Sequence, residues 1–143
     1  MEWTQELALG DERIDSTHRE FVALVDAVGK APDAAMLGAI DALIAHTEAH
    51  FGQEKGWMAA TAFPSTHCHL DEHAGVLGAI QEVRGYVSEG KFHVGQVLAR
   101  ELDTWFKQHA ATMDSMLAQW LRQCKFDTTP ELATQSEPGV TTA

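Results

Sequence analysis

The sequence is poor in cysteine and in basic residues, and each shortage argues against a class of protein. Its two cysteines, Cys68 and Cys124, are too few for the disulfide framework of a small secreted domain. Its 10 lysines and arginines are outnumbered by 21 aspartates and glutamates, which gives a formal net charge of -11 at pH 7. This charge disfavours binding to nucleic-acid phosphates and to anionic lipid, so we expect no nucleic-acid partner.

The sequence also lacks the segments that direct a chain into or across a membrane. The first residues, Met1 to Glu6, contain neither the basic nor the apolar region of a secretory signal. No apolar run approaches the length of a membrane span. We therefore expect no membrane insertion and a cytoplasmic location, and we further expect a monomer.

Helical periodicity dominates the chain, with no strand alternation and no internal repeat. Apolar residues recur at helical spacing in four segments, at about 16–28, 33–60, 66–87 and 92–124. Short breaks separate the segments, so we predict an all-α, up-down-up-down antiparallel four-helix bundle with an N-terminal arm. This domain would span residues 1–126, while residues 127–143 have little to bury and are predicted to form a flexible tail.

The pattern also predicts where helices begin and which faces they bury. Asp15 or Ser16 is the expected N-cap of the first helix, and Ser65 or Thr66 that of the third. We expect the last helix to run from about residue 92 to residue 124 and to bury one face. That face carries Leu98, Leu102, Trp105, His109, Met113, Met116 and Trp120.

Seven candidate metal ligands lie in four clusters on the predicted inner faces. The clusters are His18, His50 with Glu54, His69 with His73, and His109 with Asp114. Residues four apart lie on one face of a helix, so both i,i+4 pairs can serve a single site. Counting residues from each turn, at a rise of about 1.5 Å per residue, brings all four clusters to one level. Five imidazoles and two carboxylates are enough for two metal ions, which would compensate for their burial.

The step of five residues from His109 to Asp114 does not suit a regular helix. On an ideal α-helix it separates the two side chains by about 140°. Either the helix contains a local π-bulge at this point, or Asp114 reaches sideways as a carboxylate that bridges two ions.

Each histidine taken singly could be an ordinary core or surface residue. Five core-facing imidazoles without metal, however, would leave many buried donors and acceptors to satisfy. We predict that His46, one turn before His50, is not a ligand, that His67 and His93 lie at the surface, and that Cys68 faces away from the site. Imidazoles with bridging carboxylates indicate a dinuclear centre, for which non-haem iron fits best. Iron storage or occupancy by zinc is the simpler alternative.

These motifs resemble those of the hemerythrin family, specifically the single-domain bacteriohemerythrins. The similarity extends from Trp3 to about Trp120. It includes Gly10, Ile14-Asp15-x-x-His18, His50-Phe51-x-x-Glu54, Met58, Phe63-Pro64, His69-x-x-x-His73 and Trp105-x-x-x-His109-x-x-x-x-Asp114. The chain departs from the usual pattern at Thr17, His46, Lys55 and Phe63, and none of these departures removes a ligand.

The resemblance implies an oxo- or hydroxo-bridged pair of iron ions inside the bundle. By carry-over, one iron would be bound by His69, His73 and His109, the other by His18 and His50, and both by the bridging Glu54 and Asp114. The second iron would keep an open position for dioxygen. The implied function is reversible dioxygen binding for storage, transport or buffering, rather than enzymatic turnover.

Two other functions stay open at this point. An O2- or redox-sensing module would signal to a protein partner, for which the predicted tail is a docking segment. A di-iron peroxidase or NO-handling protein would consume its substrate, but the Glu-x-x-His motif of ferritin-like carboxylate enzymes is absent from the sequence. An apolar wall, expected to include Phe51, Trp57 and Trp105, would favour reversible binding because it excludes water and protons.

Overall fold

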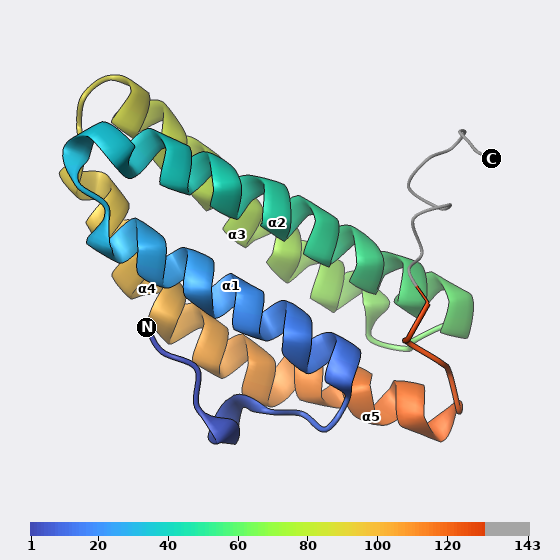
Figure 1. Cartoon of the computed structure of the whole chain (residues 1–143). Coiled ribbons are helices and arrows are strands. Elements are labelled where there is room, and N and C mark those ends of the chain that lie inside the picture. The colour runs from blue at the N-terminus through green and yellow to red at the C-terminus, as the bar shows by residue number, and fades with distance from the viewer. Residues whose placement is uncertain (131–143) are drawn as a thin grey trace.

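The structure, a computed structural model, describes residues 1–130, and in this range it contains helices and no strand (Figure 1). A short 3-10 helix, η1 (Gln5–Leu7), precedes α1 (Glu12–Lys30), α2 (Asp33–Thr61) and α3 (Thr66–Ser88). The last helical stretch is divided into α4 (His93–His109), a π-helical turn η2 (Ala110–Asp114) and α5 (Ser115–Gln123). The predicted all-α fold is confirmed, while residues 131–143 of the predicted tail lie outside the described part of the chain.

The helices form an antiparallel bundle in which neighbours along the chain are neighbours in space. Short turns join the helices, so α1 packs on α2, α2 on α3 and α3 on α4. α4 lies beside α1 and closes the ring, and α5 continues in nearly the same direction (Figure 1). Within residues 1–130, no helix combines the length and apolarity that crossing a membrane would require.

The first helix begins earlier than its apolar stripe suggests. The predicted N-cap at Asp15 or Ser16 is wrong, because Asp11 caps α1 and accepts a hydrogen bond from the N–H of Ile14 at 3.0 Å. Asp15 lies in the first turn instead, where its carboxylate accepts bonds from two backbone N–H groups of the N-terminal arm, at 2.7 and 3.2 Å. Asp11 therefore caps the helix, whereas Asp15 binds the N-terminal arm.

The chain stays packed for a few residues beyond the last helix. Thr128 is 6% exposed, and its hydroxyl group donates to the carboxylate of Asp11, whose two oxygens lie 3.0 and 2.8 Å away. This contact joins the segment that follows α5 to the start of α1.

Two apolar clusters fill the interior of the bundle. The larger includes Phe21, Val25, Ile40, Leu43, Ile80, Leu102 and Phe106, and the smaller includes Ile14, Trp57, Met58, Phe63, Leu117 and Leu121. On α1, His18 falls between residues of the two clusters, and on α2, His50 and Glu54 do the same. The buried polar side chains therefore occupy a layer between the two apolar clusters.

The π-helical turn changes which side of the last helical stretch is buried. A π turn holds more residues than an α turn, so it shifts the phase of everything that follows it. After the turn the buried residues are Leu117, Ala118 and Leu121. Met116, which the predicted continuous face would bury, is 54% exposed. That part of the prediction is wrong because it assumed an unbroken α-helix.

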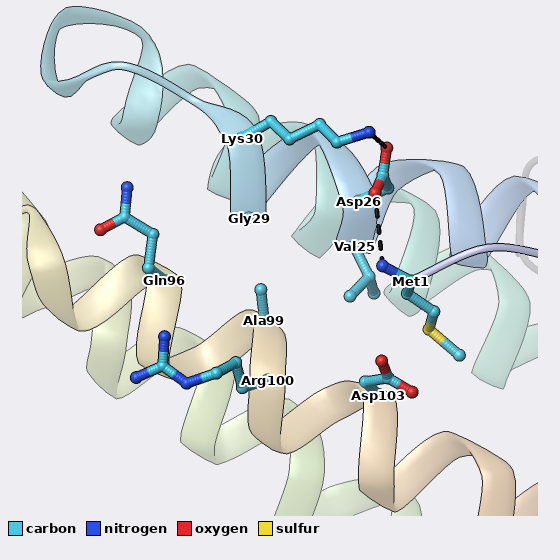
Figure 2. A pocket seen from close by; sticks show the side chains of 9 residues that line it. All are labelled: Met1, Val25, Asp26, Gly29, Lys30, Gln96, Ala99, Arg100 and Asp103. Carbon is cyan, nitrogen blue, oxygen red and sulfur yellow. Dashed lines mark hydrogen bonds and ion pairs between the residues drawn. The ribbon is translucent and has the colours of Figure 1, made fainter.

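A surface hollow of about 270 Å³ lies between α1 and α4 (Figure 2). Its lining residues are Met1, Val25, Asp26, Gly29, Lys30, Gln96, Ala99, Arg100 and Asp103. Asp26 and Lys30, at its edge, form an ion pair at 2.9 Å. None of the seven candidate ligands lines this hollow, so it is a feature separate from the buried polar layer.

Candidate metal centre

The seven predicted ligands converge in one layer of the bundle. They come from α1 (His18), α2 (His50, Glu54), α3 (His69, His73), the end of α4 (His109) and the end of η2 (Asp114). Each of them is at most 6% exposed. The four clusters thus meet at one level, as the residue counts predicted.

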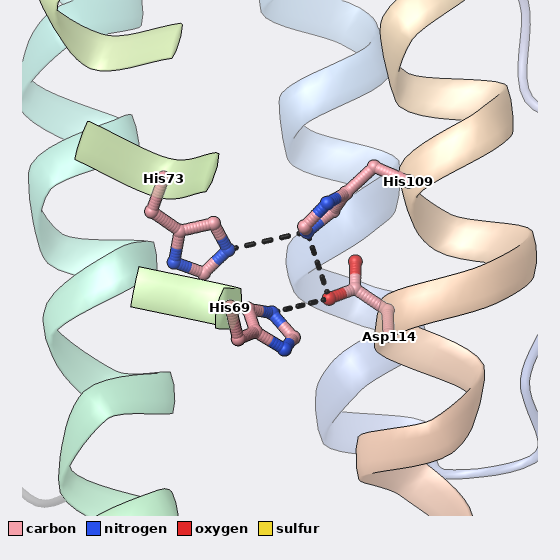
Figure 3. A group of neighbouring side chains, drawn as sticks. All are labelled: His69, His73, His109 and Asp114. Carbon is pink, nitrogen blue, oxygen red and sulfur yellow. Dashed lines mark hydrogen bonds and ion pairs between the residues drawn. The ribbon is translucent and has the colours of Figure 1, made fainter. Parts of the chain in front are cut away.

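Three histidines form one group with Asp114 (Figure 3). Oδ1 of Asp114 lies 3.1 Å from Nε2 of His69 and 3.2 Å from Nε2 of His109. The Nε2 atoms of His73 and His109 are 3.2 Å apart. The four residues offer ligand atoms that all lie within 4.8 Å of one another, so they could surround a single metal ion.

His18 and His50 form a second group with Glu54. Oε2 of Glu54 lies 2.9 Å from Nε2 of His50 and 3.9 Å from Nε2 of His18. These three residues also offer ligand atoms within 4.8 Å of one another. This group has two imidazoles where the first has three, so it could supply fewer protein ligands to an ion.

The two carboxylates connect the groups. Oε1 of Glu54, the oxygen turned away from the second group, lies 3.2 Å from Nε2 of His69 and 3.5 Å from Nε2 of His73. Oδ2 of Asp114 lies 3.1 Å from Nε2 of His18, while its Oδ1 faces the three-histidine group. Each carboxylate therefore presents one oxygen to each group, which is the arrangement that a carboxylate bridging two cations needs.

The π-helical turn brings Asp114 into this arrangement. Five residues of regular α-helix would place Asp114 about 140° away from His109 around the helix axis. The structure instead has five π-helical residues, Ala110–Asp114, immediately after His109. The wider turn returns Asp114 to the face of His109, so of the two alternatives left open by the sequence the structure contains the π-bulge.

Several polar atoms in the layer have no hydrogen-bond partner. They include both ring nitrogens of His18, Oε1 of Glu54, Nε2 of His69 and both carboxylate oxygens of Asp114. Buried polar atoms are almost always paired in folded proteins, so this concentration needs an explanation. Cations coordinated by these lone pairs would satisfy them, and imidazole with carboxylate suits iron, zinc and related ions. The donor set therefore fits a metal centre.

Both carboxylates are held in the anionic form. Burial and the neighbouring Asp114 act to raise the pKa of Glu54, but His50 and His69 outweigh them and lower it to about 2. Burial also opposes the ionisation of Asp114, yet the nearby imidazoles of His109, His18 and His69 hold the pKa of this carboxyl well below its usual range. The layer therefore carries two negative charges that cations can neutralise.

The pKa values of two imidazoles in the layer are shifted in opposite directions. Burial acts against a proton on His69, but Asp114 and Glu54 overcome it and raise the pKa of His69 to about 9. Burial lowers the pKa of His73 to about 3, and two neighbouring imidazoles act in the same direction. In the metal-free protein a protonated His69 thus compensates part of the carboxylate charge.

Aromatic rings cover the imidazoles. Phe51 stacks on His73 with 3.6 Å between ring centroids, and Trp105 stacks on His109 at 4.5 Å. Trp57, also expected in this wall, belongs to the smaller apolar cluster. Sequence reasoning missed the 1% exposed Phe106, which meets His18 edge-on at 5.0 Å.

The other histidines and Cys68 lie where the sequence predicted. His67, His93 and Cys68 are exposed. His46 is 13% exposed, its ring lies 5.7 Å from that of His50, and its Nδ1 is 3.5 Å from Glu20. Burial and the nearby imidazole of His50 lower the pKa of His46 to about 4, so it is neutral at pH 7.

One contact to a candidate ligand could not be predicted from the sequence. Oε1 of Glu72 lies 3.1 Å from Nδ1 of His109, the ring nitrogen that faces away from the other ligands. Glu72 and His109 are on different helices, so no local spacing relates them.

Comparison with known proteins agrees with this geometry. The family model described as "Hemerythrin HHE cation binding domain" matches residues 9–121. The chain is also 43% identical over 133 residues to a bacteriohemerythrin of Ralstonia nicotianae (strain ATCC BAA-1114 / GMI1000), a match that covers 93% of this chain and 97% of the relative. The buried histidines and carboxylates lie within the matched range, and the chain belongs to the hemerythrin family.

Proposed function

We propose that the protein binds dioxygen reversibly at two non-haem iron ions held by the seven buried side chains. One iron would be held by His69, His73 and His109, the other by His18 and His50, with Glu54 and Asp114 bridging both. The observation that carries the proposal is the position of the two carboxylates, each of which presents an oxygen to both histidine groups. The similarity to a bacteriohemerythrin supports it.

The unequal division of the imidazoles favours binding of an external ligand. His18 and His50 leave their ion with one protein ligand fewer than the three-histidine group provides. When bound, the iron pair supplies an open coordination position and the electrons that dioxygen binding requires. The seven side chains orient this pair, and the anionic Glu54 and Asp114 balance its positive charge.

Aromatic side chains shield the imidazoles from solvent. Phe51 and Trp105 cover two imidazoles of the three-histidine group, and Phe106 covers His18. Water and protons at such a site would promote irreversible oxidation of the iron, so their exclusion favours release of dioxygen unchanged. His46 lies beside His50, and its pKa of about 4 makes it neutral at pH 7, so it adds no cationic acid to the site.

An anaerobic-to-aerobic absorption titration, with iron quantified on the same sample, tests the proposal. We expect about two irons per chain from the ligand count. We also expect a visible charge-transfer band that appears with dioxygen and disappears when dioxygen is removed. Immediate irreversible oxidation would contradict reversible binding. The variant His73→Ala should lose iron, whereas His93→Ala, which changes an exposed histidine, should keep it.

We further propose that the protein is a cytoplasmic monomer, that its bundle domain ends near residue 126 and that it does not act as an enzyme. Sedimentation of the full chain would measure its oligomeric state, and cell fractionation its location. Steady consumption of peroxide or NO with a reductant would favour the enzymatic alternative. Capture of a protein partner that depends on residues 127–143 would favour a sensing role.

A further inference from the structure

We propose that Glu72 is a positioning residue for the metal centre, acting through His109; this inference rests on the proposed function. The carboxylate of Glu72 accepts a hydrogen bond from Nδ1 of His109, with Oε1 at 3.1 Å. Glu72 belongs to α3 and His109 to α4, so the hydrogen bond joins two neighbouring helices that both carry ligands.

The contact fixes which nitrogen of His109 is available to a metal ion. A carboxylate can only accept, so the proton of the neutral ring is held on Nδ1. Nε2 then keeps its lone pair and points inward, 3.2 Å from Oδ1 of Asp114 and 3.2 Å from Nε2 of His73. Trp105, stacked on the ring at 4.5 Å, limits its tilt. Glu72 and Trp105 together determine the tautomer and the orientation of this ligand.

The contact also makes His109 different from the neighbouring ligands. The outward Nδ1 atoms of His18, His50 and His73 are buried without a partner in the described part of the chain. An anionic acceptor on one ring nitrogen increases the basicity of the other, so His109 becomes a stronger donor to its ion. Glu72 therefore favours the oxidised state of the ion in the three-histidine group. Its side chain is 38% exposed, which screens this effect without removing it.

A pair of substitutions separates the charge from the hydrogen bond. Glu72→Gln keeps an acceptor oxygen but removes the charge, while Glu72→Leu removes both. Glu82→Gln is the matched control, because Glu82 lies on the same helix, is exposed and also loses one charge. All three variants are made in the full chain.

Two measurements test the proposal. The first is the affinity of the metal-free protein for Zn²⁺, measured by competition with a chelator; the second is the midpoint potential of the iron-loaded protein. We expect Glu72→Leu to weaken Zn²⁺ binding by roughly 10–100-fold, the usual effect of losing such a partner, and Glu72→Gln to weaken it less. Both should shift the potential to more positive values. Glu82→Gln should match the wild type in both measurements.

The outcomes distinguish this inference from the proposed function. If wild-type protein binds dioxygen while both Glu72 variants match Glu82→Gln in affinity and potential, positioning by Glu72 is refuted. A purely structural contact would lower only the thermal stability of Glu72→Leu and would leave Glu72→Gln like the wild type, which also refutes it. If wild-type protein fails to bind dioxygen but the Zn²⁺ affinities fall as expected, the proposed function fails and positioning of a metal ligand by Glu72 stands.

Discussion

The π-helical turn allows a direct test of how Asp114 reaches the metal centre. Deleting Ala111, an exposed residue of the turn, leaves Asp114 four residues after His109. An α-helix turns by about 100° per residue, so the remaining step corresponds to a net rotation of about 40° instead of about 140°. A regular α-helix can then place both side chains on one face. We expect the deletion to convert the π turn into α-helix and to preserve the metal centre.

Side chains are buried both before and after the π-helical turn, and this explains why the native chain retains the turn. If the native sequence became α-helical throughout, the segment after Asp114 would rotate by about 100°. Leu117 and Leu121, which are 0% and 1% exposed, would leave the core. Burying one leucine is worth about 1.5–3 kcal/mol, so the rotation would cost about 3–6 kcal/mol. Deleting Ala111 removes no buried side chain and should change the free energy of unfolding by less than about 1 kcal/mol.

Iron content and denaturant unfolding measure the outcome. Deletion of Thr104 is the matched control, because Thr104 is also exposed but lies before His109. Its loss would rotate His109 and the 1% exposed Phe106 away from the core, at a cost of about 1.5–3 kcal/mol for the phenylalanine. We expect this control to lose iron while the Ala111 deletion keeps about two per chain. Loss of iron in both deletions would refute the phase argument.

Three further predictions follow from packing and charge. Gly95→Ala should be less stable than Gly78→Ala by about 1–3 kcal/mol in denaturant unfolding, because a Cβ at position 95 would collide with the buried Met36, whereas the site at 78 is open. Nuclear magnetic resonance titration of the metal-free protein should give His46 a pKa of about 4, since burial and a neighbouring imidazole disfavour its charge. The raised pKa of His69, about 9, means that its proton stabilises the metal-free fold below pH 6.5 and that this stability is lost as the pH rises through 9. Metal-loaded protein should not show this alkaline loss, and it should release metal at low pH because imidazoles ligate only when neutral.

The convergence of the seven side chains could be predicted because it depends on regular geometry. Helix phase places His18 and His50 on inner faces, and a constant rise per residue sets their level relative to the turns. Nothing beyond residue counting was needed, since the turns between helices are short. The same regularity explains the error at Met116: the π-helical turn shifts every later position, so regular α-helical spacing no longer identifies the buried face after Asp114.

Contacts between helices could not be predicted in the same way. The hydrogen bond from His109 to Glu72 and the edge contact of Phe106 with His18 depend on how two helices are rotated against each other. The N-cap at Asp11 was missed for another reason. The apolar face of α1 already begins at Ile14 in the first turn, one turn ahead of His18 and remote from the stripe that starts at Phe21.

The position of the polar layer explains how the bundle can keep seven titratable side chains in its interior. The larger apolar cluster draws on α1, α2, α3 and α4, and the smaller one on α1, α2 and α5. Each cluster holds helices together on its own side of the layer, so the distances across the layer are set by apolar packing. Apolar packing thus helps to hold the ligands in place, so part of the conformational entropy of ordering them is lost on folding rather than on binding. The unpaired atoms left by this arrangement are unfavourable in the metal-free protein, and that same deficit strengthens the binding of cations that satisfy them.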